Sequence, residues 1–389
     1  MGSAITKHAA YHALQKELDG MTIAQLLNLV QKDQSFMDIN RVTVTPETRV
    51  SDAVDLCGKN PSGAVPVTQE GRIVAVLDLP LVLDYLLCLF SDATVKREVV
   101  QTLPGGAGVG VGIEYGGYGY GADVTGFPAF MQVREKSFLT SYADGVMNRG
   151  TALFGAETVA DLLKRTGKRT SVPDIGHAIA LSMPVRTLLS HWANDRSNSV
   201  CVFSPGRDVA TVDFGFLNEL DALHLVEKLL SKHELDLQKV KIKRLGLGKK
   251  TPHMVKPSTR VMHCFKLMQT ENISALPIVS PADPDKIAPD ETNDMVLKGE
   301  FSLHAMQHLN QDTLQLILGS VFEYLYRVDP EKKWSAPLTC SRRDSLHDVL
   351  TQMHVARRVH VWCVSKKRRV RGVVSLTDIM SLLFEHSAK

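Results

Sequence analysis

The 389-residue chain lacks the features that mark membrane, secreted and strongly charged proteins. No apolar run approaches the ~20 residues of a transmembrane helix, and the N-terminal region has no apolar core of a secretory signal. The net charge of +3 is too small to indicate a nucleic-acid or membrane partner by itself. The six cysteines are scattered without a CxxC pair. We therefore expect unpaired thiols in a reducing compartment and a cytoplasmic protein.

Two kinds of functional site are also missing from the sequence. The glycine-rich stretch 104–126 contains neither GxxxxGK[ST] nor GxGxxG, which favours a flexible or contact loop over a phosphate-binding loop. His304 and His308 stand at helical spacing, but without the glutamate of HExxH they are better interpreted as surface residues than as metal ligands. Since no catalytic constellation is found, we predict that the chain is not an enzyme.

The composition is that of a globular protein, with 44% hydrophobic and 22% charged residues. Its most regular pattern lies near the C-terminus. Apolar positions repeat at i, i+3, i+4 and i+7 over 346–353, which predicts an amphipathic helix. The apolar runs 360–364 and 370–374, separated by a polar turn, predict a hairpin, and a helical stripe from Ile379 predicts a closing helix.

The junction between the hairpin and the closing helix has two possible meanings. Ser375 or Thr377 can cap the helix, and Asp378 lies in its first turn. The first interpretation is an ordinary capped helix. The second is a nucleotide site, in which the helix start attracts an anion and the carboxylate accepts hydrogen bonds from ribose hydroxyls.

The same order of helix, strand, turn, strand and helix recurs along the chain. We predict an N-terminal helical segment over residues 1–40, copy 1 over 41–90, copy 2 over 184–235, copy 3 over 236–325 and copy 4 over 326–389. Residues 91–183, which include the glycine-rich loop, do not fit the repeat and are predicted to be an insertion. The charged connector 239–250 is predicted to separate two halves.

The segment 372–379, Gly-Val-Val-Ser-Leu-Thr-Asp-Ile, resembles the most diagnostic part of a cystathionine-β-synthase-type (CBS) motif. Four such motifs resemble the gamma subunit of AMP-activated and SNF1-type protein kinases. The resemblance implies an α+β fold of two tandem CBS pairs. It also implies a non-catalytic regulatory subunit that binds AMP, ADP or ATP and assembles with kinase catalytic and scaffold subunits or in another assembly. The alternative is a structural CBS protein with a constitutive nucleotide or none.

The resemblance implies one nucleotide site, in the C-terminal pair. Copy 4 matches the family at Ser375, Thr377 and Asp378, and copy 3 supplies the facing strand. The matching residues of that strand are Ile273, Ser274, Ala275 and Pro277. The aspartate position is occupied by Leu81, Phe216 and Ala305 in the other three copies, which are therefore expected not to hold a ribose.

The phosphate contacts of the family are less well matched. The family's histidine before the final hairpin aligns with Val359, and His360 should face the opposite way on a strand. A family threonine aligns with Gly248. The basic positions of copies 1 and 2 are taken by Gly63, Asn198 and Ser199. The candidates that remain for phosphate contacts are Lys249, Lys250, His253, Arg357 and Arg358.

Two further features of the sequence are a basic hairpin tip and a candidate acylation site near the N-terminus. The tip 366–369 of the last hairpin is basic, but no aromatic residues interleave with it, so a solvated turn is favoured over a nucleic-acid patch. Gly2 with Thr6 fits the myristoylation pattern, although chance could produce it. Membrane contact is expected only if Gly2 is acylated, and one myristoyl chain binds membranes marginally.

Overall fold

A computed structural model of the chain describes residues 16, 18–30, 42–60, 63–70, 72–91, 145, 148–167, 178–180, 182–195, 199–203, 214–232, 239–281, 295–331 and 336–385. Gly2, the glycine-rich loop and Asn198 lie outside these residues. None of the helices within the described ranges has the length and apolar character needed to cross a bilayer.

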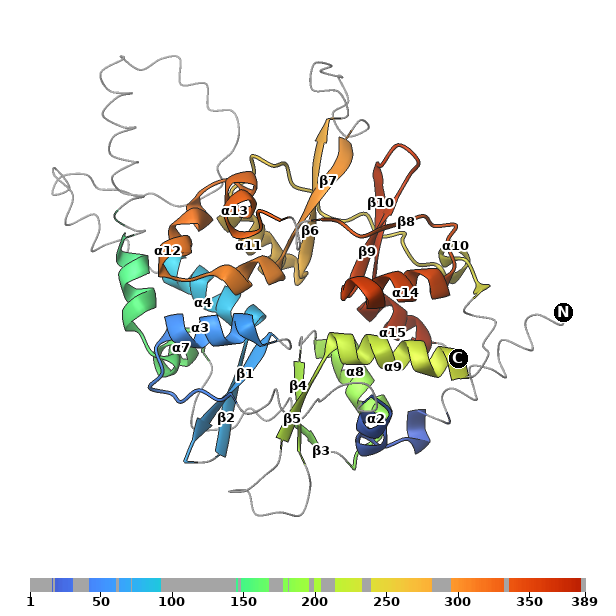
Figure 1. The fold of residues 1–389 in the computed structure, drawn as a ribbon, viewed down its shortest axis with the longest axis horizontal. Coiled ribbons are helices and arrows are strands. Elements are labelled where there is room, and N and C mark those ends of the chain that lie inside the picture. The colour runs from blue at the N-terminus through green and yellow to red at the C-terminus, as the bar shows by residue number, and fades with distance from the viewer. Residues whose placement is uncertain are drawn as a thin grey trace.

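Each of the four copies contains one antiparallel β-hairpin (Figure 1). The hairpins are β1 (Ala64–Gln69) with β2 (Arg72–Asp78), β4 (Ser199–Phe203) with β5 (Phe214–Asn218), β6 (Ala275–Pro281) with β7 (Met295–Ser302), and β9 (His360–Val364) with β10 (Val370–Ser375). An incoming segment pairs in parallel with the first strand of each hairpin. It is β3 (Ala178–Ala180) in copy 2, β8 (Thr339–Cys340) in copy 4, and a single bridge in the others, Val44 to Val67 and Val255 to Ile278.

A helix precedes and follows each hairpin. The preceding helices are α3 (Val50–Lys59), α8 (Val185–Asp195), α11 (Val261–Glu271) and α14 (Leu346–Ala356). The following helices are α4 (Leu79–Ser91), α9 (Glu219–Lys232), η7 (Leu303–His308, a 3₁₀-helix) and α15 (Leu376–Glu385). The apolar stripe predicted over 346–353 is buried in α14, and the preceding helices of the other copies also bury apolar residues.

A further helix is attached to the start of each preceding helix. The residue just before this attached helix forms a β-bridge with the residue just before the preceding helix. The bridges join Arg49 to Thr158, Pro184 to Thr22, Arg260 to Ser320 and Ser345 to Lys241. The attached helices are α7 (Val159–Arg165), α2 (Ile23–Val30), α13 (Val321–Val328) and α10 (Ile242–Leu245). Between η7 and α13 lie α12 (Gln311–Leu314) and η8 (Gln315–Leu318).

The attached helices reveal a pattern that the chain repeats twice. In each half, the attached helix that comes first in the chain, before both hairpins, is attached to the second copy, and the one that lies between the two hairpins is attached to the first. Thus α2 attaches to copy 2 and α7 to copy 1, as α10 attaches to copy 4 and α13 to copy 3.

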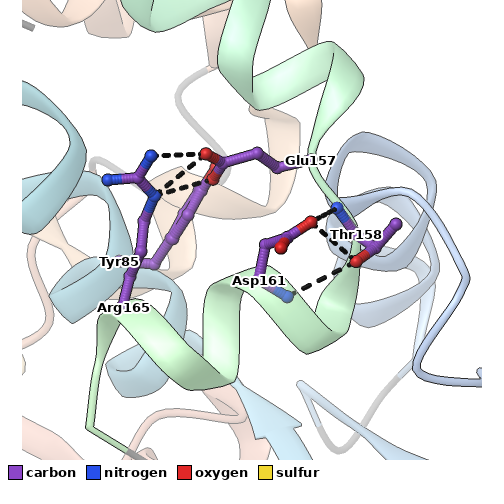
Figure 2. A network of polar contacts seen from close by, with 5 residues as sticks. All are labelled: Tyr85, Glu157, Thr158, Asp161 and Arg165. Carbon is purple, nitrogen blue, oxygen red and sulfur yellow. Dashed lines mark hydrogen bonds and ion pairs between the residues drawn. The ribbon is translucent and has the colours of Figure 1, made fainter.

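Helix α7 extends copy 1 into the stretch predicted as an insertion. Its Val159, Leu162 and Leu163 belong to the core of copy 1. Figure 2 shows the polar part of this contact, where the hydroxyl of Tyr85 on α4 donates to Glu157 at 2.9 Å. Arg165 forms an ion pair with the same carboxylate at 2.5 Å. The described residues 148–167 are therefore an integral part of copy 1.

The copies pack through two kinds of face. The helices of copy 1 share one apolar core with copy 3, and those of copy 2 share a second core with copy 4. The sheets of copies 3 and 4 meet in a third cluster, formed by Ala275, Leu297 and Trp362. Figure 1 shows the resulting arrangement around a common centre, with copies 1 and 3 on one side and copies 2 and 4 on the other.

Candidate functional site

The interface between the sheets of copies 3 and 4 brings together part of the predicted nucleotide site. Ala275 pairs with Ser302 across β6 and β7, and His360 pairs with Ser375 across β9 and β10. Directly opposed residues of neighbouring strands project from the same face of a sheet. Trp362 lies on the same face as His360, and Trp362 packs against Ala275. The faces that carry Ala275 and Ser375 are therefore turned toward the same interface.

A buried ionic cluster occupies this interface. Glu300 on β7 is 2% exposed, and its Oε1 lies 3.1 Å from Nη1 of Arg358. Trp362 donates its indole N–H to Oε2 of Glu300 at 2.7 Å. Nε2 of His360 lies 2.9 Å from the same oxygen, but without hydrogen-bond alignment, so this contact is electrostatic. One carboxylate thus compensates the guanidinium and contacts two rings in the core.

The cluster and the burial around it shift the pKa values of Glu300 and of two nearby residues, His304 and Glu219. Burial alone would raise the pKa of Glu300, but the charges of His360 and Arg358, with the hydrogen bonds to the carboxylate, hold that pKa below its ordinary value. Burial, together with the electrostatic effects of Arg358 and His360, lowers the pKa of His304 to about 4. Burial raises the pKa of Glu219 on α9 to about 7, against the effect of His360. We therefore assign a charged Glu300 and a neutral His304 at neutral pH.

The junction at the start of α15 forms a capping box. Oδ2 of Asp378 accepts hydrogen bonds from the N–H and hydroxyl of Ser375 at 2.9 and 2.7 Å. The N–H of Asp378 donates back to Oγ of Ser375 at 3.1 Å. The interpretation as a capped helix is therefore correct for these residues. Of the aspartate's oxygens, only Oδ2 takes part in the cap, so the cap does not by itself prevent Oδ1 from accepting a ribose hydroxyl.

The equivalent junction of copy 3 shows what the missing aspartate changes. Ala305 stands three residues after Ser302, so no carboxylate can close a capping box there. The element that follows Ser302 is a 3₁₀-helix without a side-chain cap. Oγ of Ser302 is buried and has no hydrogen-bond partner among the described residues, and the same is true of Nδ1 of His360. Nε2 of His360 also lacks a hydrogen bond, so three buried polar atoms of this interface are unsatisfied among the described residues.

The other predicted residues of the nucleotide site have different surroundings. Ile273 packs against the core shared by copies 1 and 3. The carbonyl of Ser274 accepts the N–H of Leu303 at 2.9 Å, which ties β6 to the start of η7. Thr377 is partly buried in the first turn of α15. Of the predicted residues of copy 3, Ala275 and Pro277 are therefore the two that the sheet register places on the interface, since Ala275 pairs with Ser302 and Pro277 with Glu300.

The structure separates the five candidate phosphate contacts. Arg358 is 7% exposed and forms the ion pair with Glu300 described above. Arg357 is exposed and ends α14 with a left-handed backbone, φ 52°. His253 is also exposed, and its Nε2 lies 3.3 Å from Oε2 of Glu271. Lys249 and Lys250 are exposed beside Gly248. Of the five, only Arg358 belongs to the ionic cluster.

Gly248 cannot be replaced by the family's threonine in this structure. Its φ of +66° suits glycine, and a Cβ would lie 2.6 Å from Sγ of Cys363. Cys363 and Val374, its neighbours, belong to the core shared by copies 2 and 4. They alternate with Trp362 and Val373, which face copy 3. The connector therefore contacts the face of the copy 4 sheet that is turned away from the interface.

Two expectations about histidines have different outcomes. Val359 packs against the core of copies 2 and 4, while His360 points to Glu300, so the predicted opposition of these neighbours is confirmed. The prediction that His304 is a surface residue is wrong, because His304 is partly buried beside the charges of the cluster. Of the positions expected not to hold a ribose, Leu81 is buried in the core of copies 1 and 3.

Sequence reasoning missed the central role of Glu300 and Trp362. The available signal was a charged residue in β7 between Leu297 and Phe301, two residues that are both buried. A charge in such a strand needs a partner. That partner, Arg358, is far away in the sequence, and local periodicity does not identify it.

Comparisons with known proteins agree with this architecture. Residues 334–385 match the family model described as the CBS domain. The 5'-AMP-activated protein kinase subunit gamma of Dictyostelium discoideum is 29% identical over 161 residues, which are 41% of this chain and 25% of that protein. The match thus spans a quarter of the length of this curated relative.

One solved structure shares the fold over most of the chain. A protein of Methanocaldococcus jannaschii, described as a candidate archaeal homologue of the same gamma subunit, aligns with a TM-score of 0.51 and 13% identity. The alignment covers 89% of this chain and 98% of that one. An uncharacterized conserved protein of Pyrococcus horikoshii aligns with a TM-score of 0.37 and 12% identity, over 56% of this chain and 80% of that one. Residues 334–385 are therefore a CBS domain, and the chain resembles the gamma subunit of AMP-activated protein kinase.

Proposed function

We propose that the chain is a non-catalytic regulatory protein of four CBS motifs in two tandem pairs. The twice-repeated arrangement of copies and attached helices supports this organisation, because α2 and α7 relate to copies 1 and 2 as α10 and α13 relate to copies 3 and 4. The gamma-subunit relative suggests partners of one class, kinase catalytic and scaffold subunits, with another assembly as the alternative.

The regulatory ligand that we propose is one adenine nucleotide, AMP, ADP or ATP, bound between copies 3 and 4. The observation that carries this proposal is the interface itself. Ser375 and Ala275 project from two facing sheets, and Ser302 Oγ and His360 Nδ1 are buried there without partners. Unsatisfied buried polar atoms are costly, so a ligand that supplies their hydrogen bonds would bind favourably.

A scaffold function without nucleotide is the second candidate, and Glu300 favours it. Its carboxylate already compensates Arg358, the one buried cation among the candidate phosphate contacts. A phosphate that approached Arg358 would have to compete with that carboxylate and would be repelled by its charge. In this alternative, an internal ion pair takes the place of a ligand and holds the two sheets together.

Nucleotide titration of matched variants tests the proposal. Asp378 and Asp348 close identical capping boxes, with Ser375 and Ser345 respectively. Replacing either aspartate by alanine should cost a similar stability, on the order of 1 kcal/mol. Only Asp378→Ala should also weaken nucleotide binding, by about ten- to a hundredfold, because a hydrogen bond to a charged group contributes about 1.5–3 kcal/mol.

Calorimetry with AMP, ADP and ATP provides the measurement, and melting temperature reports the stability of each variant. The proposal expects no more than one tight site per chain. It fails if the wild-type protein shows neither heat of binding nor a thermal shift with any of the three nucleotides. Equal nucleotide affinities of the Asp378 and Asp348 variants would also remove the assigned ribose contact. Either result leaves the scaffold function as the remaining candidate.

A further inference from the structure

Three side chains with metal-binding groups meet on the contact between copies 2 and 4, outside the nucleotide interface. His224 and Glu227 lie three residues apart on α9, and His354 lies in the last turn of α14. Residues three apart on a helix project from neighbouring positions of one face. The two helices pack together in the second core, which places His354 opposite that face.

The distances are close to those of a metal centre. One ligand atom from each residue can be chosen so that all three lie within 4.8 Å of one another. Nδ1 of His354 is 3.2 Å from Oε2 of Glu227, and the two imidazole centroids are 5.1 Å apart. Tetrahedral zinc with bonds of about 2.0–2.1 Å needs ligand atoms about 3.4 Å apart. Small side-chain rotations would therefore bring the three atoms into coordinating positions.

An ordinary histidine–carboxylate ion pair would account for His354 and Glu227 but not for the third side chain, His224. The pair of His253 and Glu271, with Nε2 and Oε2 3.3 Å apart, shows the simpler arrangement elsewhere on the chain. Around that pair no third metal-binding side chain is found within the described residues, whereas His224 joins the pair of His354 and Glu227. His224 and Glu227 are also partly buried, where a charged carboxylate benefits from a cation.

The donor set indicates which cation would bind. Two imidazoles and one carboxylate suit Zn²⁺ and related transition metals, whereas Ca²⁺ and Mg²⁺ prefer oxygen ligands alone. Three protein ligands leave the fourth tetrahedral position for water or a small ligand.

We propose that His224, Glu227 and His354 form a zinc site that links copy 2 to copy 4. His354 is 127 residues or more from the other two ligands, so the bound metal would act as a cross-link between the two halves of the chain. Because the three ligands are together only in the folded state, the metal stabilises that state. The site does not depend on nucleotide binding, so it can be tested separately from the proposed function.

The experiment uses the full chain, stripped of metal with a chelator and titrated with ZnCl₂ by calorimetry. We expect one Zn²⁺ per chain and a higher melting temperature in its presence. Loss of a residue that merely orients a ligand costs about 10–100-fold in metal affinity. His354→Ala and Glu227→Gln should therefore each weaken binding at least about tenfold and abolish the thermal shift. The matched control, His253→Ala, loses a histidine–carboxylate contact of similar length and should bind zinc as the wild type does.

Glu227→Gln keeps the shape of the side chain, which preserves the test if His354→Ala folds poorly. Circular dichroism of the metal-free variants identifies any that do not fold. The cysteines are present in every variant, so zinc bound by thiols would persist in all of them. The proposal is overturned if the wild type binds no stoichiometric zinc, or if His354→Ala and Glu227→Gln bind it with wild-type affinity.

Discussion

Glu300 and Arg358 form an ion pair that is almost fully withdrawn from water, between the third and fourth copies of the repeat. Removal of one partner from a buried pair leaves an uncompensated charge, which costs far more than the pair itself contributes. The pair therefore constrains how the two sheets dock, whether or not a nucleotide also binds there.

Glu300→Gln should destabilise the protein by about 3–5 kcal/mol, because Arg358 would remain charged and buried. Denaturant unfolding monitored by circular dichroism measures the change. The control Glu271→Gln, at an exposed site, should stay within about 0.5 kcal/mol of the wild type. The double variant Glu300→Gln with Arg358→Met should lose much less than the sum of the single variants. Additive losses would contradict the assigned pair.

Gly372→Ala should destabilise copy 4 by steric overlap. A Cβ at Gly372 would overlap the carbonyl oxygen of Gly248, so the connector would have to move away from β10. Overpacking of this kind costs about 1–3 kcal/mol. Gly20→Ala serves as the control, since a Cβ there meets nothing within 4 Å. Equal unfolding free energies for the two variants would disprove the close approach of Gly248 and Gly372.

His304 should make stability depend on pH between about 4 and 6.5. Its pKa is lowered to about 4 in the folded state, whereas the unfolded chain has the ordinary value of 6.5. As pH falls through this window, His304 binds a proton in the unfolded state but not in the folded state, so the free energy of unfolding decreases.

The variant His304→Asn removes this contribution. The free energy of unfolding of the variant, relative to wild type, should therefore rise by about 2 kcal/mol between pH 7 and pH 5. Chemical denaturation at the two pH values measures the difference. A relative free energy that stays constant with pH would show that His304 keeps an ordinary pKa.

Acylation of Gly2, which lies outside the described residues, is a further prediction. If Gly2 is myristoylated in the cell, intact-mass measurement of the native protein should show the added myristoyl group. Gly2→Ala should abolish it. Membrane association should be weak, because a single myristoyl chain binds reversibly. An unmodified glycine after removal of Met1 would disprove acylation.

Local structure could be predicted from the sequence because it depends on residues close together in the chain. The helical spacing of apolar residues over 346–353 specified a helix with a buried stripe, and α14 has it. The polar turn between 360–364 and 370–374 specified a hairpin, and β9 and β10 form it. Ser375 and Asp378 are three residues apart, so their capping box also follows from local geometry.

The partnerships between copies were decided only by the tertiary structure. Glu300 meets Arg358 across 58 residues, and His354 meets Glu227 across an even longer separation. Helix α7 joins copy 1 after the long stretch that interrupts the repeat. Periodicity shows that a face will be buried, but many faces of similar apolar character compete for it. The final choice depends on shape and on compensation of buried charge, which arise only when distant segments meet.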